Sequence, residues 1–176
     1  MEELIKDWGY IVLFLYSFGG GFLALGVAGV LSYTGDLNIY ITLIVASSAN
    51  FIGDQFLFLL ARNNKMQAKN MMKKHKRKIA LAHVMMKKYG SIVIFLQKYI
   101  YGIKTLIPLV MGLTKYDARK FIFFNILATI CWTLIVGISA YLLGEIILSY
   151  IEQFKTYGII FIVIILIILS YYFKKV

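Results

Sequence analysis

The sequence has 176 residues, among them a single cysteine, Cys131, and a single proline, Pro108. One cysteine excludes a disulfide within the chain and a cysteine-rich metal site. Histidine is almost as rare, because only His75 and His83 occur, both in a lysine-rich stretch. We interpret both as solvated residues rather than metal ligands, and we expect neither a metal nor another cofactor.

Acidic residues are also scarce. The chain has 8 of them against 19 lysines and arginines, and none lies between Asp54 and Asp117. The net charge is +11, and many of the basic residues fall within residues 62–88. In a soluble protein such a run would suggest nucleic acid. Here it lies between two apolar segments, so we expect anionic lipid headgroups as its partner and no nucleic acid.

Apolar runs, by contrast, dominate the chain, and hydrophobic residues make up 61% of it. Several windows of about 20 residues are nearly free of charge, which is the length needed to cross a bilayer. The acidic start, MEELIKDWGY, has no small-residue cleavage site, so we expect the first apolar segment to be retained. The expected fold class is an all-α polytopic membrane protein with a single domain over residues 1–176. The predicted apolar segments are 8–33, 39–61, 91–113, 121–148 and 156–173.

The basic stretch 62–88 also contains apolar residues at roughly helical intervals. This pattern is typical of an amphipathic helix lying on a membrane surface. The alternative is a solvated basic linker. Because lysine and arginine collect in cytoplasmic loops, we place this stretch on the cytoplasmic side.

The segment 91–113 contains two lysines, a glycine and the only proline. A complete crossing would place the basic residues after it, and those at the C-terminus, on the side opposite to 62–88. A re-entrant hairpin would keep all of them cytoplasmic, so the charge rule favours a hairpin. Gly102 permits unusual backbone angles and Pro108 breaks a helix, as a turn at membrane depth requires. The alternative is a kinked spanning helix whose lysines extend to the interface.

A weak internal repeat appears when the chain is laid over itself at an offset of 83 residues. The matched pairs are Tyr16 with Tyr99, Gly19 with Gly102, Leu23 with Leu106, Val27 with Val110, Gly29 with Gly112, Tyr33 with Tyr116 and Ile39 with Ile122. The first segment would then be a second hairpin of opposite orientation, turning at its glycines. Inverted repeats with broken helices are typical of transporters. We therefore expect hairpin-and-helix units over 1–61 and 89–148, about three spanning helices in all, and a final helix within 149–176.

Lysines flank the predicted turn of the second hairpin. A cation at membrane depth should face a partner or a wet cavity, and an ammonium suits a phosphate as a point charge. For Lys98 a position at the interface is an equal alternative. Tyr99 would add a further hydroxyl donor. The predicted substrate-binding residues are Lys98, Tyr101, Gly102, Lys104, Thr105 and Pro108.

Asp54 is the only acid deep within an apolar segment, and Asn50 lies one helical turn before it. An intramembrane carboxylate is a candidate counter-ion for a lysine or a proton carrier. The alternative is a structural ion pair between the two halves. Asn125 and Trp132 are interpreted as structural. No catalytic triad, carboxylate pair, phosphate-binding glycine loop or metal cluster is evident, so we do not expect an enzyme.

The stretch KYIYGIKTLIPLVMGLTKYDARKFIFFNILATICWTLIVGISAYLLG, which begins at Lys98, resembles the DedA family of SNARE-associated, or VTT-domain, membrane proteins. In that family two arginines occupy the places of Lys98 and Lys104. Lysine keeps the charge but loses bidentate phosphate recognition. The first hairpin of this chain, SFGGGFLAL, also lacks the acidic residues of the family. If those acids couple transport to protons, Asp54 is the remaining candidate.

The resemblance implies two opposed re-entrant hairpins in a bacterial plasma membrane, with the basic loop and the C-terminus cytoplasmic. It also implies lipid translocation, for which undecaprenyl phosphate is the first substrate to consider. A phospholipid flippase or scramblase is the alternative within that class. A membrane-organising protein acting through its basic loop is the alternative outside it. Assembly into a homo-oligomer stays open.

Overall fold

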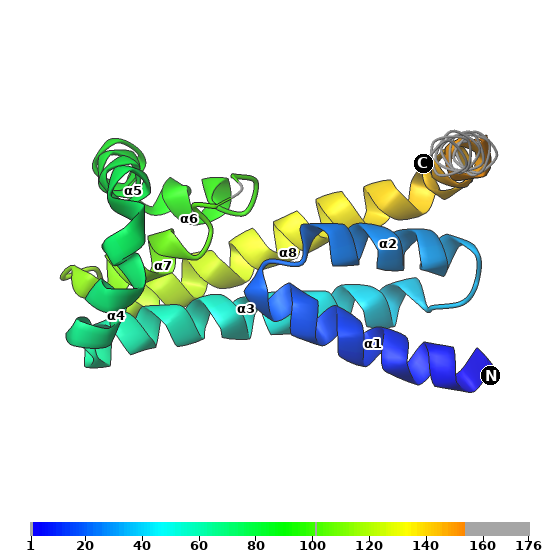
Figure 1. Ribbon diagram of the computed structural model, residues 1–176, viewed down its shortest axis with the longest axis horizontal. Helices are drawn as coiled ribbons and strands as arrows, with labels where there is room; N and C mark the ends of the chain where they lie inside the picture. Colours follow the sequence, from blue (N-terminus) through cyan, green and yellow to red (C-terminus); the bar gives the residue numbers. More distant parts are fainter. Residues whose placement is uncertain (1, 101, 154–176) are drawn as a thin grey trace, which may run out of the picture.

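The computed structural model describes residues 2–100 and 102–153, which are helical with short connections and contain no strand. Two long helices, α3 (Ile39–Asn63) and α8 (Ala118–Leu142), lie along the long axis of the molecule (Figure 1). The other elements are α1 (Glu2–Gly19), α2 (Phe22–Tyr33), α4 (Lys65–Met72), η1 (Lys73–His75), α5 (Lys76–Tyr89), η2 (Gly90–Ile92), α6 (Val93–Leu96) and α7 (Leu106–Leu113).

Each long helix begins at a polar N-cap. The side chain of Asn38 accepts hydrogen bonds from the backbone N–H groups of Tyr40 and Ile41 at the start of α3. The side chain of Asp117 accepts one from the N–H of Lys120 at the start of α8, and this bond lowers the pKa of Asp117. The caps satisfy donors that the first helical turn leaves free, so both helix starts are fixed by the local sequence.

The chain reverses for the first time between α1 and α2, at Gly20 and Gly21, as the glycine tract predicts. Both glycines have positive φ angles, 138° and 26°, a region that side chains other than hydrogen disfavour. In Figure 1 both helices extend from this join toward the same end of the molecule. The join lies against the middle of α3, because a Cβ atom on Gly53 would come within 2.2 Å of the Phe18 carbonyl oxygen.

The second reversal, residues 97–105, connects α6 with α7. Gly102 has a φ angle of 78°, in agreement with its predicted role in the turn. The prediction that Pro108 breaks the helix is wrong. Pro108 lies in the first turn of α7, where a missing N–H group removes no intrahelical hydrogen bond. Gly112 then lets α7 approach α3 closely, since a Cβ there would lie 2.3 Å from the Phe58 carbonyl oxygen.

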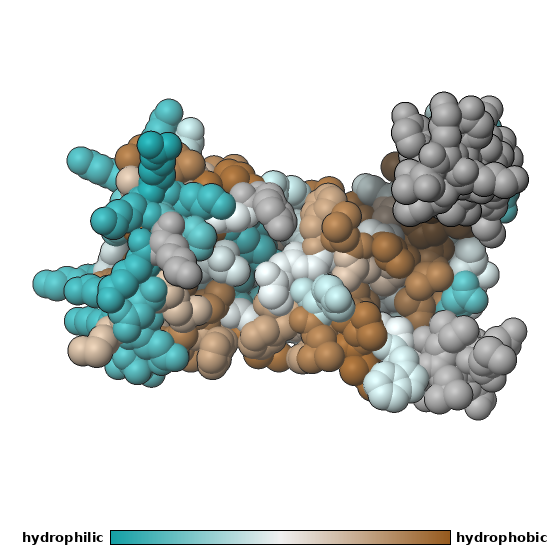
Figure 2. Space-filling view, viewed as in Figure 1, coloured by the Kyte–Doolittle hydropathy of each residue, from teal (hydrophilic) through white to brown (hydrophobic). Residues whose placement is uncertain are grey.

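The basic stretch is helical, as α4, η1 and α5, rather than an irregular linker. One face is packed against the protein through Ala68, Met72, Ala82 and Met85. Figure 1 shows α5 nearly end-on, while α3 and α8 lie lengthwise, so α5 runs across the direction of the long helices. Hydrophilic side chains gather at this end of the molecule (Figure 2).

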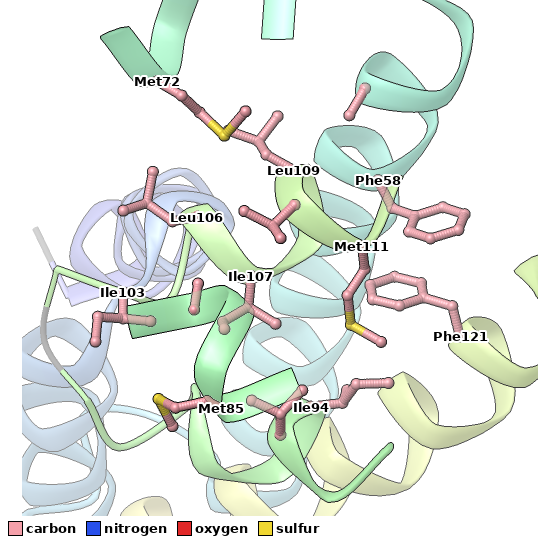
Figure 3. Packing of buried hydrophobic residues seen from close by; sticks show 14 of the residues in the cluster. Phe58, Met72, Met85, Ile94, Ile103, Leu106, Ile107, Leu109, Met111 and Phe121 are labelled. Carbon is pink, nitrogen blue, oxygen red and sulfur yellow. The ribbon is translucent and has the colours of Figure 1, made fainter. Parts of the chain in front are cut away.

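Two hydrophobic clusters hold the helices together, one in each half. In the first, the rings of Phe58 and Phe121 stack with centroids 4.2 Å apart, and Met111 of α7 lies beside them (Figure 3). The second cluster surrounds Trp132 and includes Leu25 of α2. The long helices thus form a shared spine, with α7 packed at one end and α2 at the other.

Many large apolar side chains are exposed on the described surface, which Figure 2 shows in brown away from the basic end. Among the described residues, three helical stretches are long and apolar enough to cross a membrane: Ile39–Asn63, Lys76–Leu96 and Ala118–Leu142. The described residues are thus all-helical, and their apolar helices fit a multi-pass membrane protein. The predicted segment 121–148 is interrupted by a turn at Leu143, and the predicted segment 156–173 lies outside the described residues.

Candidate functional site

A polar cluster around Lys98 occupies the centre of the molecule. The ammonium of Lys98 forms an ion pair with the carboxylate of Asp54, 2.5 Å away, and both side chains are almost fully buried. It also donates to the Asn50 Oδ1 atom at 2.5 Å, the Thr129 Oγ1 atom at 2.9 Å and the Asn125 Oδ1 atom at 3.1 Å. Three N–H donors share four acceptors, so this buried cation is fully satisfied.

The helix period explains how the cluster forms. Asn50 and Asp54 are one turn apart on α3, and Asn125 and Thr129 are one turn apart on α8, so each pair lies on one helix face. These faces meet where α3 and α8 pack together, and the second reversal inserts Lys98 between them. A buried ion pair is retained when hydrogen bonds satisfy its charged groups, as the four acceptors around the Lys98 ammonium do. The Asn50 Nδ2 and Gln97 Oε1 atoms of the cluster are buried without a partner among the described residues.

Lys104 lies in a different environment. It is 9% exposed, and its Nζ atom has no hydrogen-bond partner among the described residues. The ammonium lies over the ring of Trp132, 5.0 Å from the centroid. A cation–π contact replaces only part of the lost hydration of an ammonium. Lys104 is therefore a buried cation that still has donors to offer to a ligand.

A cavity of about 1080 Å³ separates the two reversals, and Lys104 lies on its wall. The first reversal supplies Gly19, Gly20 and Gly21, and the first turn of α2 continues the wall. Most of the remaining lining is apolar. Four lining residues are basic and none is acidic: His75, Lys78, Lys98 and Lys104. Apolar walls with a concentration of positive charge suit an amphiphile with an anionic headgroup.

Four of the predicted substrate-binding residues lie on the cavity wall. Lys98, Gly102, Lys104 and Thr105 line the cavity. Pro108 is buried within α7, away from the lining, and Tyr101 lies outside the described residues. Lys98 is enclosed by protein, so the alternative that its ammonium extends to an interface is wrong. Asp54 faces a lysine, as expected of a counter-ion.

The sequence patterns do not identify several other residues of the site. Thr129 was not singled out, and Asn125 and Trp132 were interpreted as structural, yet all three contact one of the two lysines. Gln97 was also missed, and its side-chain amide donates to the Asp54 carboxylate at 3.4 Å. The signal was the spacing of Asn125, Thr129 and Trp132, which places polar side chains on one face of an otherwise apolar helix.

Comparison with known proteins agrees with this architecture. The family model of the VTT domain matches residues 11–142. The chain is 24% identical to "Inner membrane protein YohD" of Escherichia coli K12 over 153 residues, covering 87% of this chain and 80% of that protein. It is 25% identical to "Protein DedA" of the same strain over 171 residues, covering 83% and 75%. No solved structure matches the chain. The chain thus belongs to the VTT-domain, or DedA, family of membrane proteins.

Proposed function

We propose that this protein is a lipid transporter that binds the phosphate headgroup of a membrane lipid in the cavity between the two reversals. The observation that carries the proposal is Lys104, a buried ammonium with no hydrogen-bond partner among the described residues, on the wall of that cavity. Lys78 also lines the cavity, and no acid is among the described lining residues, so we expect a positive potential there. A phosphate would be attracted to this potential while the lipid tail stays against apolar surface.

The two lysines then have different tasks. Lys98 is neutralised by Asp54 and held by three further acceptors, so it positions the second reversal against α3 and α8. Lys104 neutralises the phosphate. Gly102 and Thr105 lie on the same wall and would approach the headgroup. Asp54 remains the candidate for coupling to protons, because its protonation would free the charge of Lys98.

We further propose that the reversals are re-entrant hairpins related by an inverted repeat. The packing contacts support this. Gly29 of α2 faces the backbone of Tyr141 on α8, and Gly112 of α7 faces the backbone of Phe58 on α3. The sequence offset of 83 residues converts Gly29 to Gly112 and Phe58 to Tyr141, so the two glycines face corresponding helices, although the atoms nearest Gly29 belong to Ala140 and Gly137. Two opposed hairpins would leave a thin barrier at the cavity, as alternating access requires.

A prenyl phosphate such as undecaprenyl phosphate is the proposed substrate, since it combines a single anionic headgroup with a long apolar tail. The relative YohD is named an inner membrane protein. We place this chain in the bacterial plasma membrane, with the basic end cytoplasmic by the charge rule. A second candidate, membrane organisation through α4 and α5, is favoured by the hydrophilic surface at that end (Figure 2).

Proteoliposomes test the proposal. The assay follows a short-chain analogue of undecaprenyl phosphate and a labelled phosphatidylethanolamine, with wild type, Lys104→Met and the exposed-lysine control Lys73→Met. We expect movement of the prenyl phosphate alone, lost in Lys104→Met and retained in Lys73→Met. Equal movement of both lipids would instead indicate a scramblase. Prenyl phosphate movement that survives in Lys104→Met would contradict the proposed site.

A further inference from the structure

The N-terminus of α2 is an uncapped helix start on the cavity wall. Its N-cap residue, Gly21, provides no side-chain hydrogen bond. The first intrahelical bond runs from the N–H of Leu25 to the carbonyl oxygen of Gly21. The N–H groups of Phe22, Leu23 and Ala24 precede it, and these three residues line the cavity. A helix start of this kind carries a partial positive charge and free donors, which together favour an anion.

A second observation points to the same place. The side chain of Lys104, buried and without a hydrogen-bond partner in the described structure, extends to the residue just before this helix start. A Cβ atom on Gly20 would lie 3.7 Å from the Nζ atom of Lys104. The second reversal therefore delivers a cation to the point where the first reversal presents backbone donors. Two positive features on one cavity wall, with no acid among the described residues that line it, form a site with the chemistry of an anion receptor.

We propose that α2 and Lys104 together form one oxyanion site, in which the free N–H groups of the first turn of α2 and the ammonium bind the same phosphate group. The inference rests on the proposed function and deepens it, because it assigns headgroup recognition to backbone donors of the first reversal. The bound group is a phosphate monoester or free phosphate, which share these oxygens. Lys98 does not take part, because its donors are already occupied.

The proposed oxyanion site explains why glycine occupies the join between α1 and α2. Their positive φ angles turn α2 so that its start points into the molecule, and they keep side chains away from the approach to Lys104. A helix start lined by glycine can bring its backbone close to a ligand. This arrangement resembles broken transporter helices, whose half-helix N-termini face anionic substrate groups.

Equilibrium binding tests the site without requiring transport. Leu23 is 81% exposed, lies in the first turn of α2 and lines the same cavity as Lys104, so Leu23→Asp would place a carboxylate near the free donors. Leu23→Asn is the matched control, with the same size and no charge. Acidic residues are favourable in a first helical turn, so the substitution suits the local backbone. The probes are farnesyl phosphate, farnesol and inorganic phosphate, titrated into the full chain in detergent by calorimetry.

We expect farnesyl phosphate to bind wild type and Leu23→Asn with similar Kd values, and farnesol to bind far more weakly. We expect Leu23→Asp and Lys104→Met each to raise the Kd by about tenfold or more. Competition by inorganic phosphate at comparable concentration would support the site with the free ion as its ligand. Equal Kd values for Leu23→Asp and Leu23→Asn, or no binding of either phosphate to wild type, would overturn the inference. Binding with the expected pattern but without translocation would instead overturn the proposed transport function alone.

Discussion

The first reversal, at Gly20 and Gly21, is short and uncharged, whereas the second, at residues 97–105, is long and carries both buried lysines. The helices on either side differ as well: α1 and α2 are full helices, while α6 has only 4 residues and α7 has 8. The first reversal thus offers backbone geometry and the second offers charge. In the proposed site, the two unlike halves would therefore divide one binding task, the first supplying backbone donors and the second a cation.

The two buried lysines also lie in different environments along α3 and α8. Polar side chains of α3 and α8 surround Lys98, whereas the Lys104 ammonium lies over the face of Trp132 at the cavity and has no hydrogen-bond partner among the described residues. The satisfied cation stabilises the structure, and the unsatisfied one is available to a ligand.

The largest loss in the free energy of unfolding is expected from Asp54→Asn, which removes the charge opposite Lys98. An uncompensated buried ammonium costs about 3–5 kcal/mol. We expect a comparable loss in the free energy of unfolding, measured by denaturant titration in mixed micelles. The double variant Asp54→Asn with Lys98→Met should recover much of the loss, because no buried charge remains. If Asp54→Asn alone unfolds like wild type, the pair is not the centre of the fold.

A smaller effect is expected where each reversal packs against α3. Gly53→Ala forces a Cβ atom against the Phe18 carbonyl of α1, and Gly112→Ala forces one against the Phe58 carbonyl. Each should lower the free energy of unfolding by about 1–3 kcal/mol through overpacking. Gly26→Ala is the control, because a Cβ there meets nothing within 4 Å. A loss at Gly112 but none at Gly53 would mean that only the second half is closely packed.

At the basic end we expect a smaller effect per residue, on lipid binding rather than on unfolding. The triple variant of Lys73, Lys76 and Arg77 to glutamine should weaken the attraction of α4 and α5 to anionic lipid by about 1 kcal/mol per residue. Hydrogen exchange in nanodiscs of phosphatidylglycerol and of phosphatidylcholine would report it as a lost difference in protection between the two lipids. Translocation should be retained. Its loss would instead favour the organising role.

The smallest effect on the free energy of unfolding is expected at the N-cap of α8, and it depends on pH. The N–H of Lys120 lowers the pKa of Asp117, so the folded state favours the carboxylate. Its contribution is present at pH values above the unfolded pKa and is lost as the pH falls through the folded value. Asp117→Asn should remove this small acid-dependent loss of stability, whereas the α3 cap at Asn38 contributes none. Unfolding curves at a series of acidic pH values, compared between wild type and Asp117→Asn, would show the difference.

Much of the fold could be predicted from the sequence because length and apolar content decide which segments span a bilayer. The glycines also located the first reversal, since few other residues adopt positive φ angles. Pro108 led to a wrong prediction, because the effect of a proline on a helix depends on its position. In the first turn of α7 it removes no intrahelical hydrogen bond. The start of α7 was therefore not predictable from Pro108 alone.

The site was predictable only in part. The basic residues and Asp54 attract notice because charge is rare in apolar sequence. Which lysine would be satisfied depends on how the faces of α3 and α8 meet, and no local pattern gives that. Thr129 and Gln97 are ordinary residues until packing brings them to the Asp54 and Lys98 pair.

One paired measurement tests the central claim, that Lys98 holds the structure while Lys104 meets the substrate. Lys98→Met and Lys104→Met would be compared for free energy of unfolding and for movement of the prenyl phosphate analogue in proteoliposomes. We predict that Lys98→Met lowers stability, because it leaves Asp54 buried and unpaired. We predict that Lys104→Met is at least as stable as wild type but transports at least about tenfold more slowly. A stable, inactive Lys98→Met together with an active Lys104→Met would contradict the account.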